Sequence, residues 1–152
     1  MKNSATVCTH LMNYSRQFVP SLTDADLTVC RAPGSKTIGW LLGHLCITGD
    51  FVRRKCGRPP LTPKEWGPVY APESKASANA SDYPPMATLV KTLYDVYSDL
   101  AASIPTMGEE ILSKPNPLER AVGTYPTLGE FAVWIMTGHF GYHLGQLSEI
   151  HR

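Results

Sequence analysis

The sequence predicts an all-α fold, a four-helix bundle with long connections after its second and third helices. Apolar residues recur at helical spacing in four segments, and no run of residues has a convincing strand pattern. Prolines are concentrated between those segments, where they end or interrupt helices. A chain of 152 residues has the length of about one domain, so we expect residues 1–152 to form a single bundle.

The first helix is expected over about residues 4–19. Its buried stripe should consist of apolar residues at positions i, i+4, i+7 and i+11, which are Val7, Leu11, Tyr14 and Phe18. Pro20 ends this helix because proline lacks a backbone N–H. The second helix, at about 38–55, begins after Thr37, whose hydroxyl is a suitable N-cap, and it ends near Gly57.

The connection over residues 58–85 contains seven prolines and almost no apolar period, so it is expected to be irregular. Three aromatic residues are expected to anchor it on the bundle, and these are Trp66, Tyr70 and Tyr83. A third helix follows at about 85–103, with a buried stripe formed by Leu89, Leu93, Val96 and Leu100. After a second proline-bearing connection, Thr127 and Glu130 spell the capping box T-x-x-E before a fourth helix at about 128–149.

The composition excludes several classes of protein. Hydrophobic residues make up 43% and charged residues 18% of the chain, which is typical of a globular domain and not of a disordered one. The net charge is +1, and the one basic cluster, at 53–58, complements the dipole of a predicted helix end; we therefore expect no nucleic-acid partner. Polar residues and glycines interrupt the apolar stretches 38–52 and 131–147, so no membrane span is expected.

The four cysteines indicate a reducing environment. Cys8, Cys30, Cys46 and Cys56 form no C-x-x-C pair, and no basic-then-apolar leader opens the sequence. We therefore expect a cytoplasmic protein without disulfides. Cys46 lies two positions from His44, so it should face elsewhere on the helix as a small buried hydrophobe.

Three histidines form the candidate site. His139 and His143 are four residues apart on the fourth helix, so their side chains share one face. His44 lies in the middle of the second helix, on a face that is mostly apolar. A lone histidine on such a face is more often a hydrogen-bonded core residue. Three inward-facing histidines together favour a single divalent metal ion held between the two helices.

Three imidazoles leave a coordination position open for water or substrate, whereas a structural zinc site normally has four protein ligands. The pattern therefore favours a catalytic metal. It is not the zincin pattern, because H-E-x-x-H requires glutamate where this chain has Phe140. His10 and His151 are expected at the surface, with a fourth metal contact from His10 as the less favoured alternative.

Glycines recur beside the histidines. Gly39 and Gly43 lie on the second helix, and Gly138, Gly141 and Gly145 lie on the fourth. Each interior glycine costs a helix about 1 kcal/mol relative to alanine, so a compensating role is expected. We predict that these glycines let the two helix backbones approach closely, which would shorten the reach of the ligands.

The segments T-I-G-W-L-L-G-H-L at 37–45 and H-F-G-Y-H-L-G-Q-L at 139–147 resemble the two signatures of the DinB-like, or DinB/YfiT-like, metalloenzymes. The resemblance covers nearly the whole chain. It implies a four-helix bundle, often a homodimer, in which His44, His139 and His143 bind a divalent ion such as zinc, nickel or iron. The sequence does not identify the metal, because three imidazoles suit each of these ions.

The resemblance also implies a class of reaction. Characterised members transfer low-molecular-weight thiols such as bacillithiol or glutathione to electrophiles, or use mycothiol to isomerise maleylpyruvate. A metal in a dry cavity lowers the pKa of a bound thiol, which makes the thiolate available at neutral pH. We therefore expect a small-molecule substrate, with a low-molecular-weight thiol as the leading candidate, and a thiol S-transferase or hydrolase activity.

Hydrolysis would need a general base near the metal. Helical periodicity turns Asp50 and Glu130 away from their respective histidines, so neither is a convincing base. The alternative reading is a non-catalytic, dimeric helical protein that acts through binding and has a vestigial or structural metal site.

Overall fold

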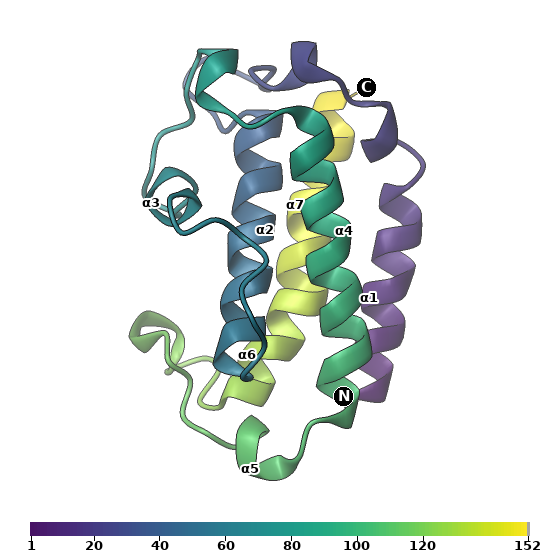
Figure 1. Cartoon of the computed structure of the whole chain (residues 1–152), viewed down its shortest axis with the longest axis vertical. Coiled ribbons are helices and arrows are strands. Elements are labelled where there is room, and N and C mark those ends of the chain that lie inside the picture. The colour runs from purple at the N-terminus through teal and green to yellow at the C-terminus, as the bar shows by residue number, and fades with distance from the viewer. Residues whose placement is uncertain (152) are drawn as a thin grey trace.

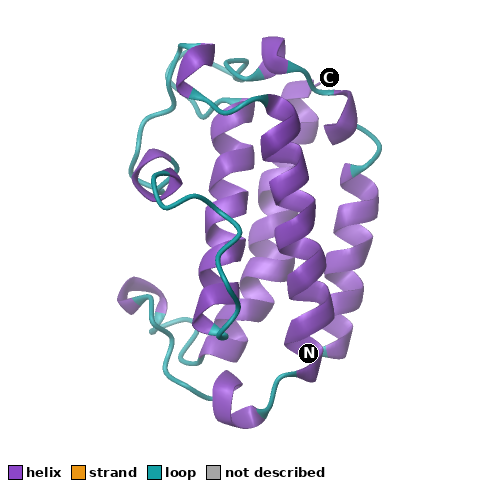
Figure 2. Ribbon diagram, in the orientation of Figure 1, coloured by secondary structure: helices purple, strands orange, loops and turns teal. Residues whose placement is uncertain are grey.

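Four long helical segments lie side by side in the computed structural model, which describes residues 1–151 (Figure 1). They are α1 (Lys2–Ser15), α2 (Ile38–Lys55), α4 (Met86–Ser103) and a last helix formed by α6 (Leu128–Trp134), a π-helical segment (Ile135–His139) and α7 (Phe140–His151). The described residues contain no β-strand, as Figure 2 shows, and the predicted all-α fold is confirmed. Within residues 1–151, no helix combines the length and the apolar character that crossing a membrane requires.

The other elements are short and lie in the connections. α3 (Trp66–Val69) follows α2, and α5 (Glu109–Leu112) follows α4. Single 3₁₀ turns occupy Val19–Ser21, Asp24–Asp26, Ala80–Asp82, Ile104–Thr106 and Glu119–Ala121. Both long connections are therefore as irregular as their prolines predict. α2 and α4 run in the same direction in Figure 1, because the connection between them carries the chain back along the bundle.

Capping residues fix the helix ends that position the site. The backbone N–H of Trp40 donates to the Thr37 hydroxyl at the start of α2, and Gly57 ends that helix with a φ of 84°. At the start of α6, the Glu130 carboxylate accepts from the Thr127 N–H at 2.9 Å, and the Thr127 hydroxyl accepts from the Glu130 N–H. This reciprocal pair is the predicted capping box.

The predicted buried stripe of the segment 4–19 was wrong for Val7 and Tyr14, whereas Phe18 is buried and Leu11 packs partly against the core. The helix α1 also ends at Ser15, earlier than Pro20 predicts. The buried residues of this helix are Ala5, Cys8, Met12 and Ser15. Val7 and Tyr14 are 45% and 39% exposed. Small and flexible side chains face the neighbouring helices instead, and the Cys8 thiol lies 3.9 Å from the carbonyl oxygen of Tyr97 in α4. Val7 and Tyr14 therefore point outward on α1, where they do not obstruct this close packing.

α2 is enclosed by α4, by the last helix and by the 58–85 connection. Trp40, Leu41, Leu42 and Leu45 are all nearly inaccessible. The three aromatic residues of the connection are buried too, at 8%, 1% and 8% exposure for Trp66, Tyr70 and Tyr83. Their predicted role as anchors on the bundle is confirmed. The connection is thus a fixed wall beside the middle of α2, where His44 lies.

An ion-pair cluster holds the start of the same connection. The Asp50 carboxylate is fully buried and accepts from the Arg53 guanidinium at 2.6 Å. It also accepts from the backbone N–H groups of Leu61 and Thr62. Asp99 in α4 accepts from Arg53 at 2.7 Å, which ties α2 to α4. Because every charge here has a partner, the buried groups do not carry the penalty of isolated ions.

Candidate metal centre

The His triad, which consists of His44, His139 and His143, converges between α2 and the last helix. One ring nitrogen from each residue lies within 4.8 Å of those of the other two. The Nε2 atoms of His44 and His139 are 3.2 Å apart, and the ring centroids of His44 and His143 are 5.0 Å apart. The structure therefore brings together all three residues that the sequence singled out.

A π-helical segment positions the two histidines of the last helix. It spans Ile135–His139, so that His139 closes it and His143 follows in α7. The two imidazole rings meet edge to face with centroids 4.5 Å apart. This segment could not be predicted from the sequence, because apolar periodicity alone predicts an uninterrupted α-helix. Such local π turns recur at functional sites, where the widened turn redirects side chains.

The tautomer of His44 is fixed from outside the site. Its Nδ1–H donates to the backbone carbonyl of Tyr70 at 2.8 Å, so in the neutral ring the lone pair is on Nε2. The indole of Trp40 stacks on the imidazole at a centroid distance of 4.7 Å and an interplanar angle of 10°. These two contacts leave the ring little freedom and direct Nε2 toward the other two histidines.

His143 is oriented in the same way by a residue of its own helix. Its Nδ1 lies 2.7 Å from the Oε1 atom of Gln146. The amide nitrogen of Gln146 donates to the Tyr142 hydroxyl, which fixes the amide so that Oε1 accepts from His143. Tyr142 itself is 63% exposed. Its role is to hold Gln146 from the solvent side.

His139 differs from the other two because its Nδ1 is buried and has no hydrogen-bond partner within residues 1–151. Burial lowers the pKa of His139 to about 3 and that of His44 to about 4, and burial also lowers the pKa of His143. The three rings are therefore neutral at physiological pH. Neutral imidazole is the form that binds metal ions, since each ring then offers a lone pair.

The donor set fits a divalent transition metal. Two nitrogens bound to one tetrahedral ion at about 2.0–2.1 Å are roughly 3.3 Å apart, close to the 3.2 Å between the two Nε2 atoms. Among the described residues, no cysteine, aspartate or glutamate joins this cluster. His10 is exposed and outside it, so the less favoured fourth contact is absent. His44, His139 and His143 are the residues suited to hold the ion.

A cavity of about 410 Å³ opens beside the triad. We call it the triad cavity, and His44 and His139 form part of its wall. Trp134 and Tyr125 stack on one another at its edge, with ring centroids 5.5 Å apart. Arg120 also lines it. The sequence analysis did not single out Arg120 or Tyr125, because nothing in the irregular 104–126 connection indicates which side chains fold over α2.

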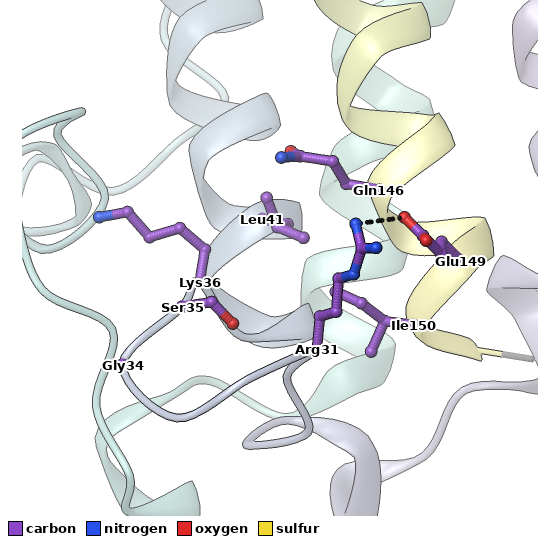
Figure 3. A pocket seen from close by; sticks show the side chains of 8 residues that line it. All are labelled: Arg31, Gly34, Ser35, Lys36, Leu41, Gln146, Glu149 and Ile150. Atoms are coloured by element: carbon purple, nitrogen blue, oxygen red, sulfur yellow. Dashed lines mark hydrogen bonds and ion pairs between the residues drawn. The ribbon is translucent and has the colours of Figure 1, made fainter.

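A separate cavity of about 320 Å³ lies near the end of the bundle where α2 begins. Figure 3 shows Gln146 at its wall, together with an ion pair between Arg31 and Glu149. Lys36 lies over the Trp40 indole, 3.8 Å from the ring centroid. Arg31 and Lys36, which are the cationic residues of this cavity, therefore already interact with Glu149 and Trp40.

Asp50 and Glu130 are both committed elsewhere. Asp50 belongs to the buried ion-pair cluster, and Glu130 caps α6. Both carboxylates therefore lie outside the triad, as helical periodicity predicts. Cys46 is buried, with its thiol 3.5 Å from the Leu89 carbonyl oxygen, and all four cysteines are free, as predicted.

The expected role of the glycines was wrong. A Cβ on Gly43 would lie 2.4 Å from the Tyr70 ring, so this glycine makes room for the 58–85 connection and not for the last helix. A Cβ on Gly138 would meet the Trp134 ring of its own helix, and one on Gly145 would have no heavy atom within 4 Å. Glycine near the triad thus accommodates aromatic side chains instead of close helix backbones.

Comparison with known proteins gives one match. Residues 10–147 match the family model described as the DinB superfamily, so the match includes all three histidines of the triad. No curated protein and no solved structure matches the chain.

Proposed function

The chain belongs to the DinB superfamily, and on that premise we propose that it is a metal-dependent enzyme of the low-molecular-weight thiol S-transferase or hydrolase type. The observation that carries the proposal is the convergence of three neutral imidazoles, two of which, those of His44 and His139, line a cavity. The triad would hold one zinc, nickel or iron(II) ion. Such an ion, when bound, supplies a Lewis-acid position that lowers the pKa of a thiol or of water.

The surrounding residues prepare the triad for this role. The Tyr70 carbonyl and the Gln146 amide keep a proton on the Nδ1 atoms of His44 and His143, so that both Nε2 lone pairs face inward. Phe131 and Trp134 contribute apolar surface to the cavity wall. They limit the access of water to the site, and a small substrate would occupy the space beside them.

The cavity wall favours thiol transfer over hydrolysis. Among the described residues, no aspartate, glutamate or cysteine lines the triad cavity. Hydrolysis would need a general base within hydrogen-bond reach of the attacking water, whereas a low-molecular-weight thiol brings its own nucleophilic sulfur. The same lack of acid and base groups supports the second candidate, a non-catalytic binding protein with a vestigial or structural metal site. The homodimer implied by the family resemblance stays a prediction.

Reconstitution followed by substrate screening tests the proposal. The purified protein would be loaded with zinc, nickel or iron(II) and incubated with glutathione, cysteine or bacillithiol and 1-chloro-2,4-dinitrobenzene. We expect thioether formation that depends on the metal and is lost in His139→Ala. His10→Ala is the matched control, because His10 is exposed and outside the triad, and it should retain the activity.

Hydrolysis of p-nitrophenyl acetate, measured on the same samples, separates the two reaction types. Metal-dependent ester hydrolysis without thioether formation would favour the hydrolase. If the metal-loaded protein catalyses neither reaction above the level of His139→Ala across the panel, the enzymatic proposal fails and the binding protein becomes the better account.

A further inference from the structure

The triad cavity continues into a second cavity. This outer cavity has a volume of about 220 Å³, and residues common to both walls are Thr48, Pro72, Leu118, Arg120 and Phe131. The shared residues come from α2, from both long connections and from α6. The two cavities therefore adjoin along these shared residues, and we call the two together the path.

The charges along this path have one sign. Arg120 lines both cavities and Arg54 lines the outer one, while no described aspartate or glutamate lines either. The Arg54 guanidinium lies 3.5 Å from the buried Asp50 carboxylate, which compensates its charge. Among the described residues Arg120 forms an ion pair with Glu73 alone, and their side chains are 53% and 69% exposed. An exposed pair of this kind contributes little free energy, so a ligand can displace Glu73.

The rest of the wall is largely apolar. Phe131 and Leu118 line both cavities, and Trp134 and Ile135 extend the apolar surface to His139. Phe131 is 5% exposed and thus forms a fixed floor. A molecule that complements this path has an apolar body next to the triad and one negative group at its outer end.

We propose that Arg120 determines substrate specificity by binding a carboxylate of a substrate whose apolar body lies in the triad cavity. A planar guanidinium matches a carboxylate through two parallel hydrogen bonds, which suits a single arginine. The inference rests on the proposed function, because it assigns the substrate class of the same site. The cavity in Figure 3 does not offer an arginine for a substrate carboxylate in the same way, since Glu149 lines it and already pairs with Arg31.

The test compares phenylacetate with its neutral isostere phenylacetamide. Both would be titrated into the full-length, metal-free protein and followed by the NMR shift of the Trp134 indole N–H. The metal is left out because it would itself attract a carboxylate. We expect phenylacetate to bind about tenfold more tightly, the ratio typical of a charge-assisted hydrogen bond.

Three variants identify the residue responsible. Arg120→Gln should abolish the preference for phenylacetate, and Glu73→Gln should strengthen phenylacetate binding by removing the competing carboxylate. Arg31→Gln is the control, because Arg31 is a similarly exposed, paired arginine of another cavity; it should keep the wild-type preference. Equal affinity for the two probes, no measurable binding of either, or a preference retained in Arg120→Gln would overturn the inference.

The outcome is separable from that of the proposed function. Protein that binds no metal but prefers phenylacetate through Arg120 would contradict the proposed function alone. Protein that binds metal and transfers thiols without any dependence on Arg120 would contradict this inference alone.

Discussion

At the scale of single residues, the orientation of the triad depends on hydrogen bonds from its imidazoles to residues outside the triad as well as on contacts among the three rings. The Nδ1 atom of His44 bonds to a backbone carbonyl, and that of His143 bonds to a side-chain amide. Such outer contacts set the tautomer and the basicity of metal-binding imidazoles. Only the Nδ1 atom of His139 is without a partner among the described residues. The site therefore has two preoriented rings and one that is less constrained.

The contact between His143 and Gln146 gives a direct prediction. Gln146→Leu keeps a side chain of similar size but removes the acceptor of the His143 Nδ1–H. We expect the affinity for zinc to fall by about 10- to 100-fold, the usual effect of losing such a contact. Competition with a chelating dye measures the affinity.

Ser148→Ala provides the matched control on the same helix, since Ser148 contacts Tyr14 and not the triad. This variant should bind zinc like the wild type. Equal affinities in Gln146→Leu and Ser148→Ala would show that the Gln146 contact does not orient the site.

The histidines of the site could be predicted because their spacing along the helices determines which helix face they occupy. Residues four apart on a helix share a face whatever the rest of the fold does, and an inward-facing third histidine then completes the cluster. Gln146 was predictable only as part of the family signature. Arg120 could not be found, because its position depends on how an irregular connection folds back over α2.

At the scale of helices and connections, local signals predicted the bounds of α2, α4 and the last helix well, whereas α1 ends at Ser15 and not beside Pro20. Thr37 and Gly57 fix the two ends of α2, and the Thr127 and Glu130 capping box starts α6. The π segment escaped prediction, because the apolar residues around it suit either type of turn. On α1 the periodic apolar stripe was misleading in part, since Ala5, Cys8 and Ser15 are buried while Val7 and Tyr14 remain at the surface.

Two glycines with similar helical positions should respond oppositely to alanine. Gly43→Ala forces its Cβ against the Tyr70 ring and should lower the free energy of unfolding by about 1–3 kcal/mol. Gly145→Ala meets nothing within 4 Å and should raise it by up to about 1 kcal/mol through better helix propensity. Urea denaturation measures both values. Equal effects of the two substitutions would contradict the view that Gly43 is required by Tyr70.

The ion-pair cluster at the end of α2 predicts a pH effect. Burial raises the pKa of Asp99, but hydrogen bonds from Arg58 and Arg53 outweigh it and lower the pKa below its ordinary value of 3.8. The unfolded carboxylate therefore takes up a proton first as the pH falls. The stabilisation by Asp99 should be complete above a pH of about 4 and should disappear progressively below it.

Denaturation of wild type and Asp99→Asn tests this dependence. The two proteins should differ in stability at a pH of about 6 and converge as the pH falls through the lowered pKa of folded Asp99. Asp95→Asn is the control, because Asp95 forms an exposed pair with Lys91 in the same helix; its effect should be small throughout. A difference for Asp99→Asn that is independent of pH would mean that charge is not the cause.

At the scale of the whole molecule, the two long irregular connections supply part of the wall of the triad cavity beside the helical bundle. The 58–85 connection supplies the carbonyl that orients His44, and the 104–126 connection supplies Arg120. Parallel α2 and α4 require the long return between them (Figure 1). The course of these segments could not be predicted, because it depends on many weak tertiary contacts and not on a periodic pattern.

The measurement that bears most directly on this account is the metal content of the purified protein. Wild type would be incubated with zinc, nickel or iron(II), desalted and analysed by mass spectrometry, in parallel with His143→Ala and His10→Ala. We predict about one ion per chain in wild type and in His10→Ala, and a much lower content in His143→Ala. A wild-type content below about 0.2 ions per chain with each metal, or equal contents in wild type and His143→Ala, would contradict the triad as a metal site.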